Sequence, residues 1–294
     1  MNLAGKKINL PVTLAGRFFR LIYILNPTNG EPVAVKVEPD ETNAPQLIFE
    51  YKIYNVLAGG VGIPRVEKFC REHKHNILVM DLLGPSLEDM FDQCNRIFSL
   101  KTVVTLARQL LDRIEFIHNN GLVHRDMKPD NMLLGLGDHS DVVFIIDFGL
   151  AKMYRDVTTG RHIPYRTRRG LTGTARYCSI HAHLGLELSR RDDLESLGYI
   201  LVYFLRGGLP WMGLSTKKKD DKNEQIHTLK SRTATEVLCT RLPEEFATYM
   251  KYVKGLAFEE LPDYVYLKQL FDGLDETLTD EYMFDWKKEI TPTM

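Results

Sequence analysis

The decisive stretch of this chain runs from Leu122 to Asn131 and reads LVHRDMKPDN. It places a carboxylate at Asp126, an ammonium group at Lys128 and an amide at Asn131. The three groups stand at fixed offsets on what we expect to be one tight loop. The loop therefore gathers an acid, a cation and a neutral oxygen donor within a few residues.

A second acidic signature, Asp147-Phe148-Gly149, directly follows the apolar run 142–146. Moving a phosphoryl group from a nucleotide to a hydroxyl needs one carboxylate to orient the hydroxyl and accept its proton. It also needs an ammonium group to offset phosphoryl charge, and an amide with a second carboxylate to hold magnesium. Two signatures in this order are typical of a protein kinase. A turn-capping aspartate is the alternative at Asp126, but it leaves Lys128, Asn131 and Asp147 without a role.

Two charged residues from the first part of the chain fit the same chemistry. Lys36 alternates with apolar neighbours in the stretch VAVKV at 33–37, so its stem can pack in a strand while its ammonium group extends further. Glu50 lies among apolar residues at near-helical spacing in the segment 46–57. In a kinase the lysine neutralises nucleotide phosphates and the helix carboxylate holds it. A solvated lysine and an unrelated glutamate are the alternative for either residue alone.

Composition sets broad limits. The chain has 294 residues, 44% of them hydrophobic, which suffices for one large core or two lobes. Its net charge of −1 gives no global attraction to nucleic acid or anionic membrane, so anion recognition must come from local clusters. The four cysteines form no CxxC pair and predict free thiols in a reducing compartment. We expect a cytoplasmic protein, with the nucleus as a second location.

The order of the predicted elements indicates an α+β fold with two lobes, a β-rich N-lobe at 1–83 and a mainly helical C-lobe at 84–294. Residues 1–30 carry no acid, which fits a transit peptide, but a strand–turn–strand hairpin explains the apolar residues better. The stretch 70–75 predicts an exposed hairpin rather than a metal site. Other predicted elements are strands at 18–25, 33–37 and 77–80, helices at 46–57, 103–117, 193–206 and 243–258, and a loop at 215–222.

Asp193 stands where an apolar helix begins. A buried carboxylate there could accept backbone N–H bonds from the loop around Asp126 and hold that loop rigid. Capping the N-terminus of its own helix is the alternative role.

From about Gly5 to about Trp286 the chain resembles the casein kinase 1 family of serine/threonine kinases. The stretches that carry the resemblance are LLGPSLED at 82–89, GLAK at 149–152, LTGTARY at 171–177, SRRDDLESLGY at 189–199 and LPW at 209–211. The Ala-Pro-Glu triplet of typical kinases is absent. Ser179-Ile180-His181 stands near where this family has Ser-Ile-Asn.

The resemblance implies ATP and Mg²⁺ as cofactors, and monomers that phosphorylate serine or threonine near acidic or already phosphorylated residues. No nucleic acid or membrane partner is expected. Asp126 and Lys128 would be catalytic, and Asn131 and Asp147 would hold the metal. ATP would also contact Lys36, Glu50, Gly16, Met80, Asp81 and Leu83, with Met80 as gatekeeper. Substrate anions would bind Arg176 and Lys222, with a second anion site made by Arg125, Lys152 and Arg169.

The glycine-rich loop departs from the family pattern. Its Gly-x-Gly-x-Phe-Gly falls on the stretch AGRFFR at 15–20, where no family glycine is at its own position and Gly16 lies one place off. Glycine there lets backbone amides approach phosphates without a Cβ. Arg17 or Arg20 could instead clamp ATP, or the added bulk could obstruct it. Two hypotheses stay open: an active serine/threonine kinase, and a pseudokinase that binds acidic or phosphorylated partners without phosphoryl transfer.

Overall fold

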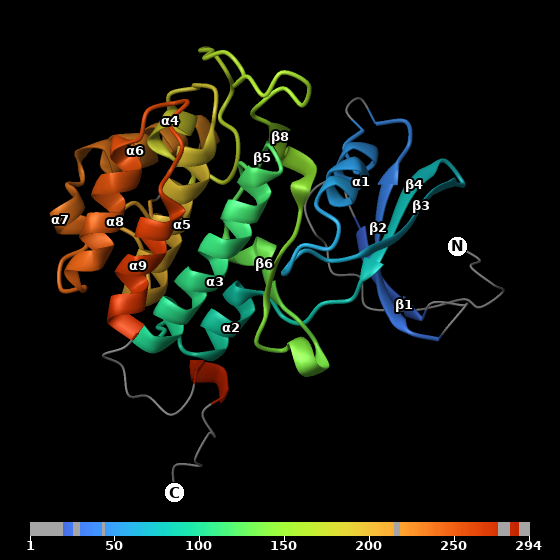
Figure 1. The fold of residues 1–294 in the computed structure, drawn as a ribbon, viewed down its shortest axis with the longest axis horizontal. Coiled ribbons are helices and arrows are strands. Elements are labelled where there is room, and N and C mark those ends of the chain that lie inside the picture. The colour runs from blue at the N-terminus through green and yellow to red at the C-terminus, as the bar shows by residue number, and fades with distance from the viewer. Residues whose placement is uncertain (1–19, 26–29, 43–44, 215–217, 276–282, 288–294) are drawn as a thin grey trace, which may run out of the picture. The chain divides into compact units, whose positions relative to one another are not determined.

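The computed structural model describes residues 20–25, 30–42, 45–214, 218–275 and 283–287, and the chain divides into two compact units. The first unit comprises the chain up to Pro85 together with Leu133–Gly149, and the second comprises Ser86–Met132 together with the chain from Leu150 onward. Figure 1 shows that strands dominate the first unit and helices the second, which confirms the two-lobed α+β prediction.

An antiparallel sheet forms the first unit, with strand order β1-β2-β4-β3. Its strands are β1 Arg20–Leu25, β2 Pro32–Pro39, β3 Val66–Glu72 and β4 His75–Asp81. The pairing of β1 with β2 confirms the first predicted hairpin, whose turn at 26–29 lies outside the described residues. The predicted hairpin at 70–75 is confirmed too. His73 and Lys74 both adopt positive φ, as a tight two-residue turn requires.

Strand β2 is buried on both faces because each face meets a different partner. Val33, Val35 and Val37 join an apolar cluster with Ile77 on one face. The alternate residues, among them Lys36 and Glu38, point to the other face. Helix α1 (Leu47–Val56) lies beside the sheet (Figure 1), and its contacts with Lys36 and Glu38 place it on that second face. The sheet therefore presents a buried lysine to a helix.

The second unit is built around α3 (Leu100–Asn119), whose predicted apolar face is buried. Gly121, at φ 80°, follows its C-terminus, as predicted. Helix α3 packs against α5 and α9, and α5 packs against α8 (Figure 1). The other helices are α2 Leu87–Gln93, α4 Ile180–His183, α5 Arg190–Arg206, α6 Lys219–Arg232, α7 Thr235–Leu238, α8 Glu244–Gly255 and α9 Tyr264–Asp275.

Short strands and 3₁₀ turns carry the remaining segments. Strand β5 (Leu122–Val123) pairs with β8 (Lys152–Met153), and β6 (Met132–Leu134) pairs with β7 (Val143–Ile145). The 3₁₀ turns span Pro129–Asn131, Gly137–His139, Phe148–Leu150 and Asp285–Lys287. Among the described residues, no helix combines the length and apolarity that crossing a membrane requires.

Two segments differ from the sequence prediction. The predicted loop at 215–222 is wrong from Lys219 onward, since α6 begins there and is held by the packing of Ile226 and Lys230. The units also differ from the predicted lobes, because 133–149 belongs to the first unit. Backbone hydrogen bonds attach this segment to the first unit: Gly84 N–H donates to Leu134 O, and Ile145 N–H donates to Gly62 O.

Candidate functional site

Three charged side chains of the first unit meet at Lys36. Its Nζ lies 2.7 Å from Glu50 Oε2 and 2.9 Å from Asp147 Oδ1. Lys36 and Glu50 are buried, whereas the side chain of Asp147 is 37% exposed. Burial acts to lower the pKa of Lys36, but the charges of Glu50 and Asp147 outweigh it and hold that pKa above its ordinary value. The lysine is therefore a fixed cation beside a solvent-accessible carboxylate.

Glu38 positions the helix that supplies Glu50. Its carboxylate accepts hydrogen bonds from the backbone N–H groups of Gln46, at 2.8 Å, and Leu47, at 3.3 Å. These are donors at the start of α1 that no helical carbonyl can satisfy. Because Glu38 and Lys36 lie on the same face of β2, this contact brings the first turn of α1 to the lysine.

Asp147 and Phe148 are held against Tyr54 of α1. The Phe148 and Tyr54 rings meet edge to face at 5.1 Å, and Asp147 N–H donates to the Tyr54 hydroxyl at 3.3 Å. Asp147 adopts φ 67°, a left-handed conformation unusual for a residue with a side chain. The strain is tolerated where the surrounding packing imposes it, which points to a functional position.

The residues predicted to surround a nucleotide base lie at the end of β4. Met80 is buried and pairs with Ala34 of β2. The Asp81 carboxylate accepts the backbone N–H of Arg65 at 2.8 Å, and Leu83 is partly exposed. Gly16 lies outside the described residues, as does the rest of the predicted glycine-rich loop up to position 19.

In the second unit, the loop His124–Asn131, which we call the Asp126 loop, is organised around one carboxylate. Lys128 Nζ lies 3.0 Å from Asp126 Oδ2, and the Thr174 hydroxyl donates to Asp126 Oδ1 at 2.7 Å. Asn131 Nδ2 donates to the backbone oxygen of Asp126 at 3.0 Å. The structure thus brings together the three loop residues that the sequence singled out, and adds a hydroxyl on the carboxylate.

The side chain of Asp193 holds the backbone of this loop, as predicted. Its carboxylate accepts the backbone N–H groups of His124, at 2.7 Å, and Arg125, at 2.8 Å, and its Oδ2 lies 2.9 Å from His118 Nε2. Burial acts to raise the pKa of Asp193, but His118 and the N–H of His124 hold that pKa below its ordinary value. Burial lowers the pKa of His118, so a neutral imidazole donates to a charged carboxylate.

The alternative role for Asp193, N-capping its own helix, is wrong. Helix α5 begins at Arg190 with Ser189 as its N-cap residue, and Asp192 accepts the backbone N–H of Ser189 at 2.7 Å.

The side chains predicted to form the second anion site make contacts within the protein. Lys152 and Arg169 do come together, but around an internal carboxylate, that of buried Glu187, at 2.6 and 3.1 Å. Burial acts to raise the pKa of Glu187, but these two cations hold it below its ordinary value. Arg125 donates to the backbone oxygen of Leu150 at 2.6 Å. The Glu187 carboxylate therefore offsets one of the three positive charges at this position.

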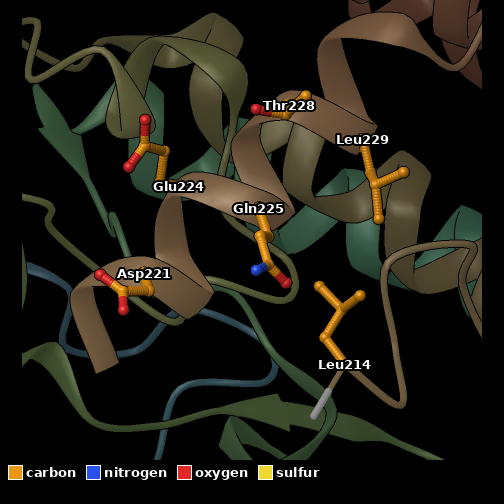
Figure 2. Close-up of a pocket in the computed structure, with 6 residues that line it drawn as sticks. All are labelled: Leu214, Asp221, Glu224, Gln225, Thr228 and Leu229. Carbon is orange, nitrogen blue, oxygen red and sulfur yellow. The ribbon is translucent and has the colours of Figure 1, made fainter. Parts of the chain in front are cut away.

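Arg176 and Lys222, the other predicted anion ligands, are both exposed. The Arg176 guanidinium lies 5.6 Å from the centre of the Tyr177 ring, and Trp211 Nε1 donates to the Arg176 backbone oxygen at 2.8 Å. Lys222 lies on α6, and two acids of the same helix, Asp221 and Glu224, line a pocket of about 460 Å³ (Figure 2). Residues lining this pocket are Leu214, Asp221, Glu224, Gln225, Thr228 and Leu229. Lys222 therefore has carboxylates as close sequence neighbours.

Sequence reasoning missed Lys230, which holds the segment that carries Arg176. Its buried Nζ donates to the backbone oxygens of Ala175, at 2.8 Å, and Cys178, at 2.5 Å, and lies 5.2 Å from the Trp211 ring centre. Burial lowers its pKa to about 8. Sequence reasoning also missed the contacts of His118 and Thr174, because no local pattern distinguishes them from ordinary helix and loop residues.

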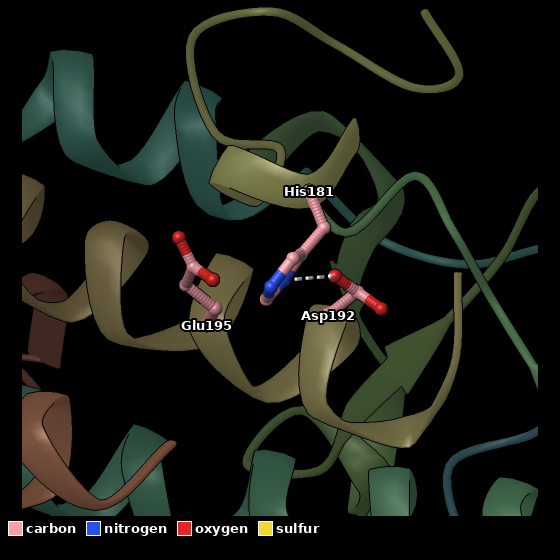
Figure 3. A group of neighbouring side chains, drawn as sticks. All are labelled: His181, Asp192 and Glu195. Carbon is pink, nitrogen blue, oxygen red and sulfur yellow. Dashed lines mark ion pairs between the residues drawn. The ribbon is translucent and has the colours of Figure 1, made fainter. Parts of the chain in front are cut away.

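His181, which replaces the asparagine of the resembled family, lies between two buried acids. Its Nδ1 is 3.2 Å from Asp192 Oδ1, and Glu195 lies on the other side of the ring (Figure 3). Both acids already serve backbone groups, since Asp192 accepts from Ser189 N–H and Glu195 accepts from Ile180 N–H at 3.0 Å. We interpret the group as a link between α4 and α5.

Two side chains have the chemistry of magnesium ligands, which are oxygen donors. The side-chain nitrogen of Asn131 donates a hydrogen bond to the Asp126 carbonyl. The side-chain oxygen of Asn131 is therefore the atom that could bind a metal ion. Asp147 supplies a partly exposed carboxylate beside Lys36. Each of these side chains therefore offers an oxygen of the kind that magnesium prefers.

One comparison with known proteins bears on this chemistry. Residues 15–256 match the family model described as the protein kinase domain. The match covers more than half of the chain, and it includes the Lys36 cluster, the Asp126 loop and Asp193.

Proposed function

Because the chain belongs to the protein kinase family, we propose that it is an active kinase that transfers the γ-phosphoryl group of ATP to serine or threonine hydroxyls of proteins. The observation that carries the proposal is the hydrogen bond from the Thr174 hydroxyl to Asp126 Oδ1 at 2.7 Å. Asp126 already accepts an aliphatic hydroxyl proton donor, which is the interaction that a substrate serine or threonine needs.

Each of these residues has a separate role in the proposed reaction. Asp126 orients the attacking hydroxyl and accepts its proton, and Lys128, held 3.0 Å from it, offsets the charge that develops on the phosphoryl group. Lys36, kept cationic by its two carboxylates, binds nucleotide phosphates. Asn131 and Asp147 would hold magnesium, which neutralises phosphate charge when bound. The intact Lys36–Glu50 pair supports an active enzyme over a pseudokinase.

We also propose that the enzyme, a casein kinase 1-like monomer, prefers acceptors near acidic or phosphorylated residues. Arg176 supports this preference, because its exposed guanidinium can bind a phosphate with two parallel hydrogen bonds. Lys222 is the weaker candidate, since its helix also carries Asp221 and Glu224.

A transfer assay tests the enzymatic proposal. Purified chain with magnesium and labelled ATP should phosphorylate an acidic or phosphorylated peptide, and Asp126→Asn should lower the rate by about 10³-fold. Asp130→Asn is the matched control, because Asp130 lies in the same loop but is exposed, and its rate should match the wild type. Equal rates in the wild type and Asp126→Asn would contradict the proposal. Nucleotide binding without transfer would favour the pseudokinase.

The ATP-facing loop can be tested separately. Restoring glycine at Ala15, Arg17 and Arg20 should lower the Michaelis constant for ATP, because backbone amides could then approach the phosphates. A higher constant would instead identify the arginines as ligands of ATP.

A further inference from the structure

The segment between β8 and α4 is strongly basic. From Lys152 to Arg169 the chain has five arginines and one lysine but a single acid, Asp156, although the whole chain has a net charge of −1. Such a local excess of positive charge creates a field that the rest of the protein does not.

The backbone of this segment is fixed at several points. Ile163 N–H donates to Tyr154 O at 2.7 Å, and Asp156 N–H donates to Arg161 O at 2.8 Å. Further along, Glu187 N–H donates to Arg166 O at 2.8 Å, and Arg169 N–H donates to Gly185 O at 2.8 Å. The side chains are therefore presented from a defined framework.

The cations of the segment fall into an inner and an outer set. In the inner set, Lys152 and Arg169 pair with Glu187, and Arg155 donates to the backbone oxygen of Asn119. The outer set consists of Arg161, Arg166 and Arg168, which we call the arginine loop, and all three are exposed. Within the part of the chain that the structure describes, no acid pairs with these three side chains.

Several exposed guanidinium groups on one loop suit a ligand with several anionic groups. The aromatic side chains near these arginines contact the protein edge to face: His162 and Tyr165 pack on Phe258, with ring centres 4.6 and 5.2 Å apart, and Tyr165 stays 51% exposed. A single half-exposed ring is less than the series of aromatic side chains on which successive nucleic acid bases stack. A protein segment rich in carboxylates or phosphates is the better fit.

We propose that the arginine loop binds an acidic or multiply phosphorylated stretch of the protein substrate, away from the phosphorylated hydroxyl. This role depends on the proposed kinase function. Arg168 lies in the same continuous segment as Thr174, whose hydroxyl contacts Asp126. Six residues span at most about 21 Å, which limits the separation of their Cα atoms. The part of the acidic stretch that meets Arg168 would therefore lie no more than about six extended residues from the acceptor.

Binding measured without nucleotide tests the loop independently of phosphoryl transfer. The probe is a fluorescent peptide with a block of glutamates about five residues from a serine, and a second probe carries phosphoserines instead. The variant Arg161→Gln/Arg166→Gln/Arg168→Gln should weaken binding of either probe about tenfold. The control Lys52→Gln/Arg232→Gln/Arg241→Gln removes the same charge from exposed positions elsewhere and should bind like the wild type.

Three results would overturn the proposal. Equal binding by wild type and the loop variant would show that the arginines take no part. If the control variant weakens binding as much as the loop variant does, the effect comes from net charge rather than from these three positions. Binding of single-stranded oligothymidylate through the same arginines, at least as tightly as the peptides, would make the loop a nucleic acid site. As a second measurement, wild-type binding should weaken several-fold between about 0.05 and 0.3 M salt, because exposed charges are screened. Salt-independent binding would contradict the proposal.

Discussion

The Asp126 loop and the arginine loop use charge in opposite ways. In the Asp126 loop the carboxylate is buried and held by Lys128 and Thr174, and its backbone is bound to Asp193. In the arginine loop the backbone is equally well bound, but Arg161, Arg166 and Arg168 extend into solvent.

The difference separates two tasks that one kinase domain must perform. A buried charge with fixed partners needs no rearrangement when charge develops during reaction, so it acts on the catalytic rate. An exposed charge is hydrated and screened, contributes about 0–1 kcal/mol per pair, and acts mainly on substrate binding. Variants of the first loop should therefore change kcat, and variants of the second should change KM.

Removing the anchor of the Asp126 loop should have the largest effect. In Asp193→Asn one amide oxygen replaces a charged carboxylate that accepts from His124, Arg125 and His118. We expect the free energy of unfolding to fall by about 2–4 kcal/mol. We expect kcat to fall about 10²-fold, because a small misplacement of the loop carries a large kinetic penalty. Denaturant titrations and steady-state kinetics measure the two effects.

The exposed Asp138→Asn is the control for Asp193→Asn and should behave like the wild type. The pH dependence gives a second check. Because the folded-state pKa of Asp193 is lowered, its contribution to stability is present above its ordinary value near 4. That contribution disappears as the pH falls through the folded-state pKa. The stability difference between wild type and variant should thus not decrease between pH 8 and 5, and a loss within that range would contradict this role.

The hydroxyl on Asp126 should matter less than the anchor. Thr174→Val removes the donor at 2.7 Å but leaves Lys128 in place, so we expect kcat to fall about tenfold with the KM for ATP unchanged. Thr174→Ser retains a hydroxyl and should keep most of the activity. If the valine variant keeps full activity and the serine variant loses it, the methyl group rather than the hydrogen bond positions the segment.

How far the sequence predicts this site depends on how local each interaction is. Asp126, Lys128 and Asn131 are close in the chain, so their spacing alone predicted their grouping. The pair of Lys36 and Glu50 followed from a kinase pattern and is confirmed at 2.7 Å. Alternating apolar residues likewise predicted strand β2, and apolar residues at helical spacing predicted the buried face of α3.

Long-range electrostatics could not be predicted in the same way. Glu187 stands between two leucines, and nothing near it in sequence indicates that it forms ion pairs with Lys152 and Arg169. The highly charged start of α6 predicted a loop because its sequence has little amphipathic pattern. Burial of Ile226 and Lys230 in tertiary packing decides the helix.

Lys230 supports the segment that carries Arg176, and its burial makes it sensitive to pH. Its pKa is lowered to about 8, so between about pH 8 and 10.5 the unfolded chain binds a proton that the folded chain lacks. Between pH 7 and 9 the free energy of unfolding should rise by about 1 kcal/mol more in the wild type than in Lys230→Met. Urea titrations at the two pH values measure this difference.

Lys254→Met is the matched control for Lys230→Met, because Lys230 and Lys254 both lie over the Tyr199 ring, at 4.9 and 5.7 Å. This variant should keep the rise in stability with pH. If Lys230→Met keeps it as well, the buried ammonium group is not its source.

The smallest effect concerns the two exposed cations proposed to bind a substrate phosphate. Arg176→Ala should raise the KM for a peptide with a phosphoserine near its acceptor about threefold, and leave the unphosphorylated peptide nearly unchanged. Lys222→Ala should change either KM less than about twofold, since Asp221 and Glu224 neutralise its surroundings. A larger effect of Lys222→Ala than of Arg176→Ala would reverse this ranking. Asp221→Asn/Glu224→Gln would then be expected to lower the KM, because Lys222 would act without opposing carboxylates.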